Sequence, residues 1–359
     1  MLVTNNIDWN FNNTYLKLPK DMLSKQNPDP VKNPAIVIIN HDLSNHLNIN
    51  LKSLDDKYLA SVFSGNLLPN GSETFSMAYA GHQFGHFTVL GDGRAITIGE
   101  HFNKKNQGYE IQFKGSGKTK YSRNGDGKAA LGPMLREYII SEAMHYLNIP
   151  TTRSLAVIKT GEKVKRETEL NGAILTRVAS SHIRVGTFQY FAFKKDQKNL
   201  KILIDYTINK HFPHLKNGKN IYLNLIKELV DRQIDLIVNW MRVGFIHGVM
   251  NTDNMTLSGE TIDYGPCAFM DIYDPKTVFS SIDHFGRYAY YNQPTIAKWN
   301  LARFAECLIP LLDEDKNKAI ELATNQINEF DKMYEEKWLK MMREKLGFIS
   351  QEKSDEVLI

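Results

Sequence analysis

Apolar runs at short spacing predict strands in the first half of the chain. Residues 86–100 alternate apolar and polar side chains around the Gly-Asp-Gly of 91–93, which predicts a hairpin with its turn at those glycines. A further turn is expected at Thr160-Gly161, where polar residues separate two apolar runs. The remaining strands are predicted at 35–40, 108–115, 153–159 and 172–179.

Helical periodicity dominates the second half of the chain. The segment 220–244 is long, amphipathic and closed by a glycine. In the first half, Ser53 is expected to cap a short helix. Further helices are predicted at 130–149, 295–311 and 313–346. Strands followed by helices indicate an α+β protein with two lobes. We expect an N-terminal arm at 1–50, a β-rich lobe at 51–190 and a mainly helical lobe at 191–359.

Charge and composition remove several classes of protein. The chain has 359 residues and a formal net charge of +4 without a long run of Lys or Arg, so nucleic acid is not an expected partner. No apolar stretch reaches the roughly 20 residues of a membrane helix, so no membrane partner is expected either. The amino terminus lacks the pattern of a secretion signal. Cys267 and Cys307 lie far apart and fit a reducing compartment, so we expect a cytoplasmic protein.

The most informative segment is HGVMNTDN, which ends at Asn254. It puts the carboxylate of Asp253 beside the amide of Asn254, and a second carboxylate, Asp263, follows nine residues later. Mg²⁺ prefers oxygen ligands and combines one or two carboxylates with phosphate oxygens and water. Protein kinases use a loop acid near the nucleophile, a loop Asn on the metal and a later Asp on the metal. The alternative is a polar Asx turn without a metal.

Lys114 and Glu137 add a second element of a nucleotide site. Lys114 ends a predicted strand, and Glu137 lies 23 residues later on the following predicted helix. A strand lysine that contacts nucleotide phosphates and is held by a helix glutamate is the arrangement found in kinases. Taken singly, each residue is more simply a surface charge. Together with Asp253, Asn254 and Asp263 they favour a nucleotide site.

Two glycine-containing loops are candidates for nucleotide contacts, the first for phosphate and the second for a ribose or base edge. Gly91 and Gly93, with Arg94 after them, form one, and Asp126 with Gly127 belongs to the other. Glycines allow backbone N–H groups to approach phosphate closely. Taken by itself, the first loop is more simply a β-turn in a hairpin, and the alternative for the second is an ordinary type I′ turn. The GSGKT at 115–119 is not a P-loop, because position 112, where that motif needs a glycine, is Gln.

Arginines and histidines complete the set of candidates. Arg177 closes a predicted strand and Arg184 follows it, so both suit bidentate phosphate contacts, with surface ion pairs as the alternative. His82 and His86 have the i, i+4 spacing of zinc ligands, but the glycines around them disfavour a helix. We therefore interpret these histidines as buried and hydrogen-bonded.

The motifs together resemble the selenoprotein O family, also called the YdiU family of protein adenylyltransferases. The resemblance covers roughly residues 10–310 and fades beyond them. It is carried by these segments in order: MAYAGHQFG (77–85), LGDGRAI (90–96), FKGSGKTKYSRNGDGKAAL (113–131), LREYIISEAM (135–144), IPTTRSLAV (149–157), ILTRVASSHIRVG (174–186), HGVMNTDNM (247–255), IDYGPCAFMD (262–271) and FGRYAYYNQP (285–294).

This resemblance implies a protein-kinase-like fold in which ATP is bound in a flipped orientation. AMP would then be transferred to Ser, Thr or Tyr hydroxyls of proteins. Asp253 would be the catalytic base, and Asn254 and Asp263 would hold Mg²⁺, or Mn²⁺ in its place. The remaining residues would bind the nucleotide: Gly91, Gly93, Arg94, Lys114, Glu137, Asp126, Gly127, Arg177, Arg184 and, through the metal, Asp263.

Two other functions remain compatible with these residue types. A kinase that transfers the γ-phosphate needs the same lysine, acids and metal. A non-catalytic ATP-binding module of the pseudokinase type is the second, because family members usually continue through a longer C-terminal helical region. Members often carry a redox-active Cys or selenocysteine in that region, and this chain has neither near its end.

Overall fold

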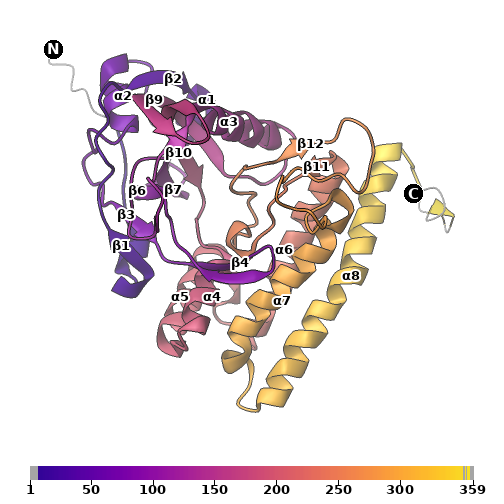
Figure 1. Cartoon of the computed structure of the whole chain (residues 1–359). Helices are drawn as coiled ribbons and strands as arrows, with labels where there is room; N and C mark the ends of the chain where they lie inside the picture. Colours follow the sequence, from indigo (N-terminus) through magenta and orange to yellow (C-terminus); the bar gives the residue numbers. More distant parts are fainter. Residues whose placement is uncertain (1–6, 351, 353, 356–359) are drawn as a thin grey trace. The chain divides into compact units, whose positions relative to one another are not determined.

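The computed structural model describes residues 7–350, 352, 354 and 355, and these form a β-rich part followed by a mainly helical part (Figure 1). The predicted α+β class is confirmed. Contacts group the chain into two units: residues up to Tyr79 with Val89–His182, and Ala80–Thr88 with the residues from Ile183 onward. The three domains expected from the sequence, divided after residues 50 and 190, stay a prediction.

The first unit is built on an antiparallel sheet, which has eight strands among the described residues. Seven strands follow the order β1-β3-β6-β7-β10-β9-β2, and β8 pairs with β10. The central strand β7 lies between β6 and β10, with Lys114 opposite Ala95 on one side and Leu175 on the other. The strands are β1 (Leu23–Lys25), β2 (Ala35–Ile39), β3 (Phe75–Met77), β6 (Ala95–Phe102), β7 (Gly108–Lys114), β8 (Ala129–Ala130), β9 (Arg153–Lys165) and β10 (Glu169–Ala179).

Strand β7 is buried on both faces but divides its residues by polarity. Ile111 and Phe113 point into an apolar core that also contains Phe63 and Ile174. Because side chains alternate across a strand, Gln112 and Lys114 lie on the opposite face. Both are buried, at 0% and 5% exposure, so this second face is a buried polar surface.

Three helices cover this sheet: α1 (His41–Leu47), α2 (Asp56–Phe63) and α3 (Leu131–Tyr146). The predicted helix from Ser53 is confirmed as α2, but its cap is wrong. The Asp55 side chain, not that of Ser53, accepts from the backbone N–H of Tyr58. Asp55 directly precedes the first helical residue, which is the position from which a side chain reaches the free N–H groups of the first turn.

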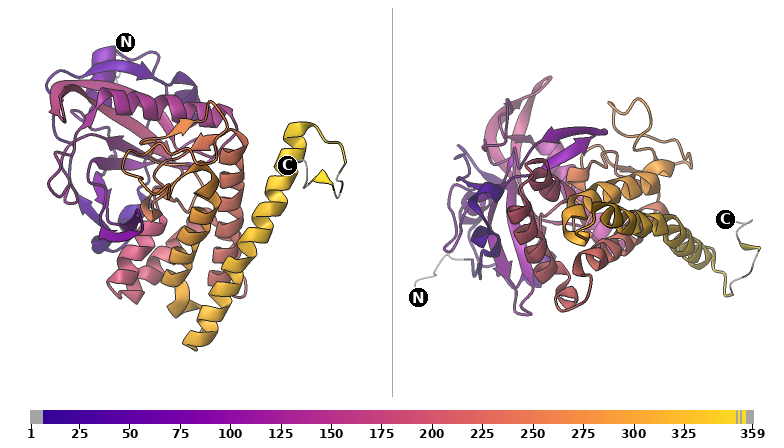
Figure 2. Two further views of the ribbon diagram at one scale, coloured as in Figure 1. Left: turned by 45° about the vertical axis from the view of Figure 1, so that its right-hand side comes forward. Right: turned by 90° about the horizontal axis from the view of Figure 1, so that it is seen from below.

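The second unit is mainly helical. Its helices are α4 (Val185–Phe193), α5 (Gln197–His211), α6 (Ile221–Arg242), α7 (Gln293–Leu312) and α8 (Lys316–Leu346), and α6, α7 and α8 pack side by side (Figure 2). Two short sheets accompany them, β4 (Ala80–Gln83) with β5 (His86–Val89) and β11 (Phe245–Ile246) with β12 (Ala268–Phe269). Short 3₁₀ helices lie in this unit at Pro213–Leu215, Thr252–Asn254 and Tyr290–Asn292, and in the first unit at Thr14–Lys17 and Lys20–Met22. No helix among the described residues is both long and apolar enough to cross a membrane.

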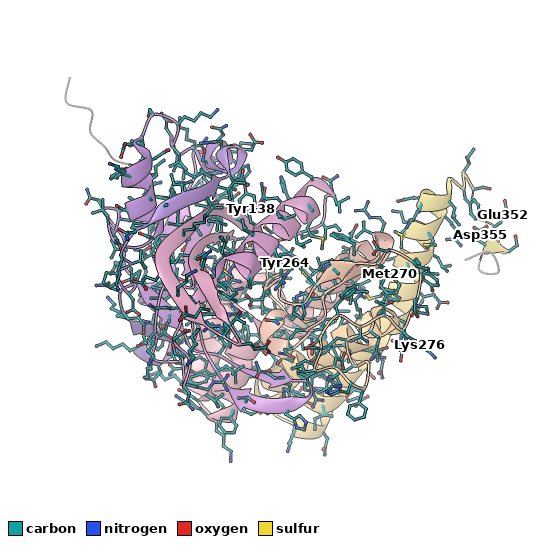
Figure 3. The ribbon with its side chains drawn as sticks, turned by 45° about the horizontal axis from the view of Figure 1, so that its top comes forward. Tyr138, Tyr264, Met270, Lys276, Glu352 and Asp355 are labelled. Carbon is teal, nitrogen blue, oxygen red and sulfur yellow. The ribbon has the colours of Figure 1, made fainter. Side chains whose placement is uncertain are left out.

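Helix α8 ends at Leu346, and the next residue, Gly347, has a positive φ of 77° and so adopts the left-handed conformation common after a helix. Beyond it, the carboxylate of Asp355 (labelled in Figure 3) accepts from Nε of Arg343 at 2.6 Å. This contact attaches the chain beyond the helix to its last turn.

Two turn predictions are wrong. Strand β5 pairs with β4, and the turn lies at Phe84-Gly85, where both φ angles are positive (49° and 88°). Two consecutive positive φ values are what a tight hairpin turn requires. Strand β9 continues through Thr160-Gly161, so no turn ends it there. The register between β9 and β10 shifts at this point, as at a β-bulge, and Gly161 has a positive φ of 72°.

Candidate active site

The buried polar face of β7 holds a cluster of charges in the first unit. Lys114 Nζ lies 2.6 Å from Glu137 Oε2, and Arg177 Nη1 lies 3.4 Å from Glu137 Oε1. All three side chains are at most 6% exposed. The glutamate on α3 is therefore shared by a cation from β7 and a cation from β10. The structure brings together the predicted Lys114, Glu137 and Arg177.

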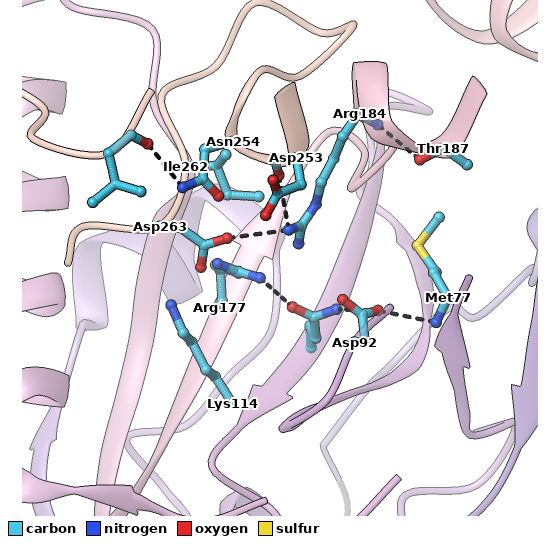
Figure 4. A network of polar contacts seen from close by, with 12 residues as sticks. Met77, Asp92, Lys114, Arg177, Arg184, Thr187, Asp253, Asn254, Ile262 and Asp263 are labelled. Carbon is cyan, nitrogen blue, oxygen red and sulfur yellow. Dashed lines mark hydrogen bonds and ion pairs between the residues drawn. The ribbon is translucent and has the colours of Figure 1, made fainter. Parts of the chain in front are cut away.

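A chain of hydrogen bonds continues from this cluster (Figure 4). Arg177 Nη2 donates to Gln112 Oε1 at 2.5 Å, and Gln112 Nε2 donates to Asp92 Oδ2 at 3.3 Å. Asp92 Oδ2 also accepts from the backbone N–H of Met77 at 3.0 Å. This chain links the arginine to the first glycine loop, because Asp92 stands between Gly91 and Gly93.

In each glycine loop there is one position, Gly91 or Gly127, at which the Cβ atom of any other residue would clash with a neighbouring residue. At Gly91, with φ 144°, a Cβ atom would lie 2.3 Å from the Tyr121 ring. At Gly127, with φ 68°, it would lie 1.9 Å from the carbonyl oxygen of Gly117. The two loops are thus held against their neighbours by close backbone approach.

The other predicted residues of these loops lie at the surface of the first unit. A Cβ atom at Gly93 would lie 3.0 Å from the Tyr121 carbonyl oxygen, and Arg94 is exposed. Asp126 forms an ion pair with Arg166, and this pair keeps the pKa of Asp126 below its usual value. Both side chains are about 40% exposed (43% and 39%), so the pair contributes little to stability.

In the second unit, a one-turn 3₁₀ helix carries Asp253 and Asn254. The amide nitrogen of Asn254 donates to the carbonyl of Val249 at 2.9 Å. This bond fixes the orientation of the amide and leaves its oxygen as the atom that can ligate a cation.

Asp263 adopts a positive φ of 60°, which is uncommon for a residue other than glycine. Its Oδ2 atom lies 3.1 Å from Arg184 Nη1, and the same nitrogen donates to the carbonyl of Asp253 at 3.1 Å (Figure 4). Arg184 is 2% exposed. One buried guanidinium therefore connects the two predicted acidic positions, Asp253 and Asp263.

The Asp253 carboxylate is buried, with 6% of the residue exposed. Its Oδ1 atom has no hydrogen-bond partner among the described residues. Burial, the largest cause, raises the pKa of the carboxyl to about 6. Arg184 and a hydrogen bond from the Gln83 side chain oppose the shift, and the Asp263 charge adds to it. A carboxylate with this pKa is a stronger proton acceptor than an ordinary aspartate.

The histidine interpretation is correct in part for His82, which is hydrogen-bonded but only half-buried, and it is wrong for His86. His82 lies on β4 and its Nδ1 atom is 2.8 Å from the amide nitrogen of Gln189. His86, on β5, is exposed. The ring of His82 contacts that of Phe87, the residue next to His86. Because neighbouring residues of a strand point to opposite faces, His86 lies on the other face, so the i, i+4 spacing gives the two histidines no common environment.

Several residues of these networks were not singled out from the sequence. Gln112 and Asp92 connect Arg177 to the glycine loop, and Gln83 lies beside Asp253. A polar residue between the apolar positions of a buried strand was the available signal for Gln112. No comparable signal exists for Gln83, because its contact depends on the packing of segments about 170 residues apart.

The two clusters provide a buried lysine–glutamate–arginine group and an acid–amide–acid loop, which are residue types of an enzyme that transfers part of a nucleotide. The chain belongs to the family described as protein adenylyltransferase SelO, whose model matches residues 5–359. It is accordingly an ATP-using nucleotidyltransferase of the class that transfers AMP to protein. The prediction that the resemblance fades after about residue 310 is wrong, because the family match continues to residue 359.

Curated relatives agree with this membership. The chain is 62% identical over 353 residues to the protein nucleotidyltransferase YdiU of Pelagibacter ubique (strain HTCC1062), covering 98% of this chain and 73% of the relative. It is 60% identical over 349 residues to the same protein of Nitrosococcus oceani, covering 97% and 71%. Among solved structures, the chain matches the kinase domain of a Toxoplasma gondii specific rhoptry antigen with a TM-score of 0.31 and 10% identity. The match covers 75% of this chain and 83% of that chain.

Proposed function

We propose that Asp253 is the base that activates a Ser, Thr or Tyr hydroxyl of an acceptor protein for AMP transfer. The observation that supports this role is the buried carboxylate oxygen of Asp253, which has no partner among the described residues. A buried acceptor atom without a partner is costly unless a donor is supplied, and an acceptor hydroxyl is such a donor. Cytoplasm is the proposed location, since neither Cys267 nor Cys307 forms a disulfide within the part of the chain that the structure describes.

The proposed step is one exchange of bonds at the α-phosphorus. The acceptor oxygen forms a bond to the α-phosphorus while the bond to the bridging oxygen of the β-phosphate breaks. The hydroxyl proton passes to the Asp253 carboxylate, and pyrophosphate leaves with the electron pair. Such transfers depend mainly on in-line positioning and on cations around the developing charge.

The proposed nucleotide ligands of the first unit are the cations Lys114 and Arg177, with Glu137 holding both in place. The glycine loops would contribute backbone N–H groups, at Gly91 and Gly93 beside Arg94 and at Gly127 beside Asp126. In the second unit, Arg184 is proposed as a further phosphate ligand. The flipped orientation of ATP rests on the family resemblance alone.

Asn254 and Asp263 are the proposed ligands of Mg²⁺. The described residues contain no group of three His, Cys, Asp or Glu side chains that could hold a metal by themselves. The available donors are the amide oxygen of Asn254 and the Asp263 carboxylate, which fit a cation that takes its other ligands from phosphates and water. When bound, the cation would neutralise charge on the phosphates.

The position of the radioactive label decides between AMP and phosphate transfer. We expect label in protein from ATP labelled at the α-phosphate and none from ATP labelled at the γ-phosphate, when each is incubated with Mg²⁺ and a protein mixture. Asp253→Asn should lower the transfer by about 10²–10⁴-fold, the usual contribution of a general base. Label from the γ-phosphate alone would make this chain a kinase. ATP binding without transfer of either label would favour the non-catalytic module.

Asp263→Asn separates the metal role from the backbone strain at this position. Asparagine tolerates positive φ as well as aspartate does, so the fold should be retained. The loss of the charge should lower AMP transfer by at least about 100-fold, as expected when charge stabilisation at the transition state is removed. The titration of activity with Mg²⁺ should shift to higher concentration. An unchanged Mg²⁺ titration would contradict the metal role.

A further inference from the structure

The hairpin of β4 and β5 belongs to the second unit although it lies about 170 residues before the catalytic loop in sequence. Its motif, AGHQFGH, has no role in the proposed nucleotide or metal contacts. The hairpin packs on the 3₁₀ helix that carries Asp253 and on α4. It is therefore a structural neighbour of the proposed base within one contact unit.

A closed ring of three hydrogen bonds joins the hairpin to this loop. The backbone N–H of His82 donates to Thr252 Oγ1 at 2.7 Å, and that hydroxyl donates to Gln189 Oε1 at 2.6 Å. Gln189 Nε2 donates to His82 Nδ1 at 2.8 Å, since an amide nitrogen can only donate. Every member both donates and accepts, so the ring fixes the side chain of Thr252.

A second contact repeats this pattern two residues further along the hairpin. The backbone N–H of Phe84 donates to Asn251 Oδ1 at 3.1 Å, and Tyr288 Oη donates to the same oxygen at 2.7 Å. The N–H groups of His82, on β4, and of Phe84, in the turn that follows it, both donate to this loop and so form one edge of the hairpin. The side chains of Asn251 and Thr252 are thus attached to consecutive positions of that edge.

Beside these contacts, at Gly81, the hairpin approaches Asp253 directly. A Cβ atom at Gly81 would lie 2.3 Å from Asp253 Oδ1 and 2.9 Å from its Cβ. The backbone of residue 81 is therefore in contact with the carboxylate. Gly186, at the start of α4, approaches both the hairpin and Asp253, since a Cβ atom there would lie 1.9 Å from the Ala80 carbonyl oxygen and 3.3 Å from Asp253 Cα.

We propose that Thr252, Gln189 and the hairpin edge at His82 form a positioning device that fixes the Asp253 carboxylate for the transfer reaction. This inference rests on the proposed role of Asp253. None of the three residues is proposed to touch a reacting atom. Their effect is on the location of the carboxylate, which follows Thr252 directly in the chain.

The test compares Thr252→Val with Thr252→Ser. Valine keeps the shape of threonine but removes the hydroxyl, so the backbone N–H of His82 and the Gln189 side chain lose their common partner. We expect kcat for AMP transfer to fall by about 10–100-fold, with KM for ATP unchanged, because a misplacement of about 1 Å has effects of this size. Serine restores the hydroxyl and should keep kcat within about threefold of the original protein, since the same donor and acceptor are present.

Thr207→Val is the matched control. Thr207 is fully buried in α5, and its hydroxyl donates to the Leu203 carbonyl within that helix, so the same substitution there should leave kcat unchanged. Amide hydrogen exchange in residues 249–255 should increase in Thr252→Val and not in the other two variants. Equal kcat and exchange in Thr252→Val and Thr252→Ser would overturn the inference. If Asp253→Asn itself retains transfer, the proposed base is wrong, and the exchange data alone then decide whether the hairpin holds the loop.

Discussion

Replacing Glu137 by glutamine is expected to lower the free energy of unfolding by about 3–5 kcal/mol, the usual cost of breaking a buried ion pair from one side. Glutamine has nearly the same shape, but it removes the carboxylate that Lys114 and Arg177 share at 2.6 and 3.4 Å. The two cations remain buried, and the desolvation of charge is then poorly offset. Urea denaturation followed by circular dichroism measures this loss.

Two further variants show how much of this loss of stability comes from the shared carboxylate. One removes a single cation of the cluster, and the other breaks a separate ion pair on the same helix. Lys114→Met removes one cation and leaves Glu137 with Arg177, so it should destabilise less than Glu137→Gln. Glu142→Gln, on the same helix, breaks a bidentate pair with a single arginine, Arg153, in which the side chains keep 12% and 14% exposure, so it should cost less than Glu137→Gln. If Glu137→Gln cost no more than Glu142→Gln, the shared carboxylate would not organise this cluster.

The sequence was sufficient for the parts of the site that depend on local pattern. Lys114 was found because it ends a strand with clear apolar alternation, and Glu137 because its helix follows. The acid–amide pair Asp253–Asn254 was found because its residue types are adjacent. In each case the physical requirement is met within a short segment, so it is visible without the fold.

The parts that were missed depend on contacts between distant segments. The Gly-Asp-Gly of 91–93 looks like a hairpin turn, but its backbone hydrogen-bonds to residues 77–79: Leu90 N to Tyr79 O, and Asp92 N to Met77 O, both at 2.9 Å. The actual turn at Phe84-Gly85 places an aromatic residue at positive φ, which turn propensities disfavour. Packing of the hairpin against the loop near Asp253 is the compensating interaction, and such packing cannot be inferred from a single sequence.

Gly81→Ala is expected to lower AMP transfer by about 100-fold while leaving ATP affinity unchanged. The backbone of Gly81 is not in the glycine-only region, so alanine meets no conformational penalty of its own. Its Cβ atom would instead lie 2.3, 2.8 and 2.9 Å from Oδ1, Cγ and Cβ of Asp253. All three atoms must move, which displaces the proposed base by a distance at which catalysis falls by about that factor. Steady-state kinetics together with ATP titration by calorimetry measure the two quantities.

Gly132→Ala supplies the control for this substitution. A Cβ atom at Gly132 meets nothing within 4 Å, and the residue lies in α3, so alanine there should leave transfer unchanged and stabilise the helix by up to about 1 kcal/mol. Combining Gly81→Ala with Asp253→Asn provides a stricter test, because residues that act through one another are not additive. If the glycine acts only by allowing the carboxylate its position, the double variant loses no more activity than Asp253→Asn. A further loss equal to that of Gly81→Ala alone would mean that the hairpin acts on the reaction by some route other than Asp253.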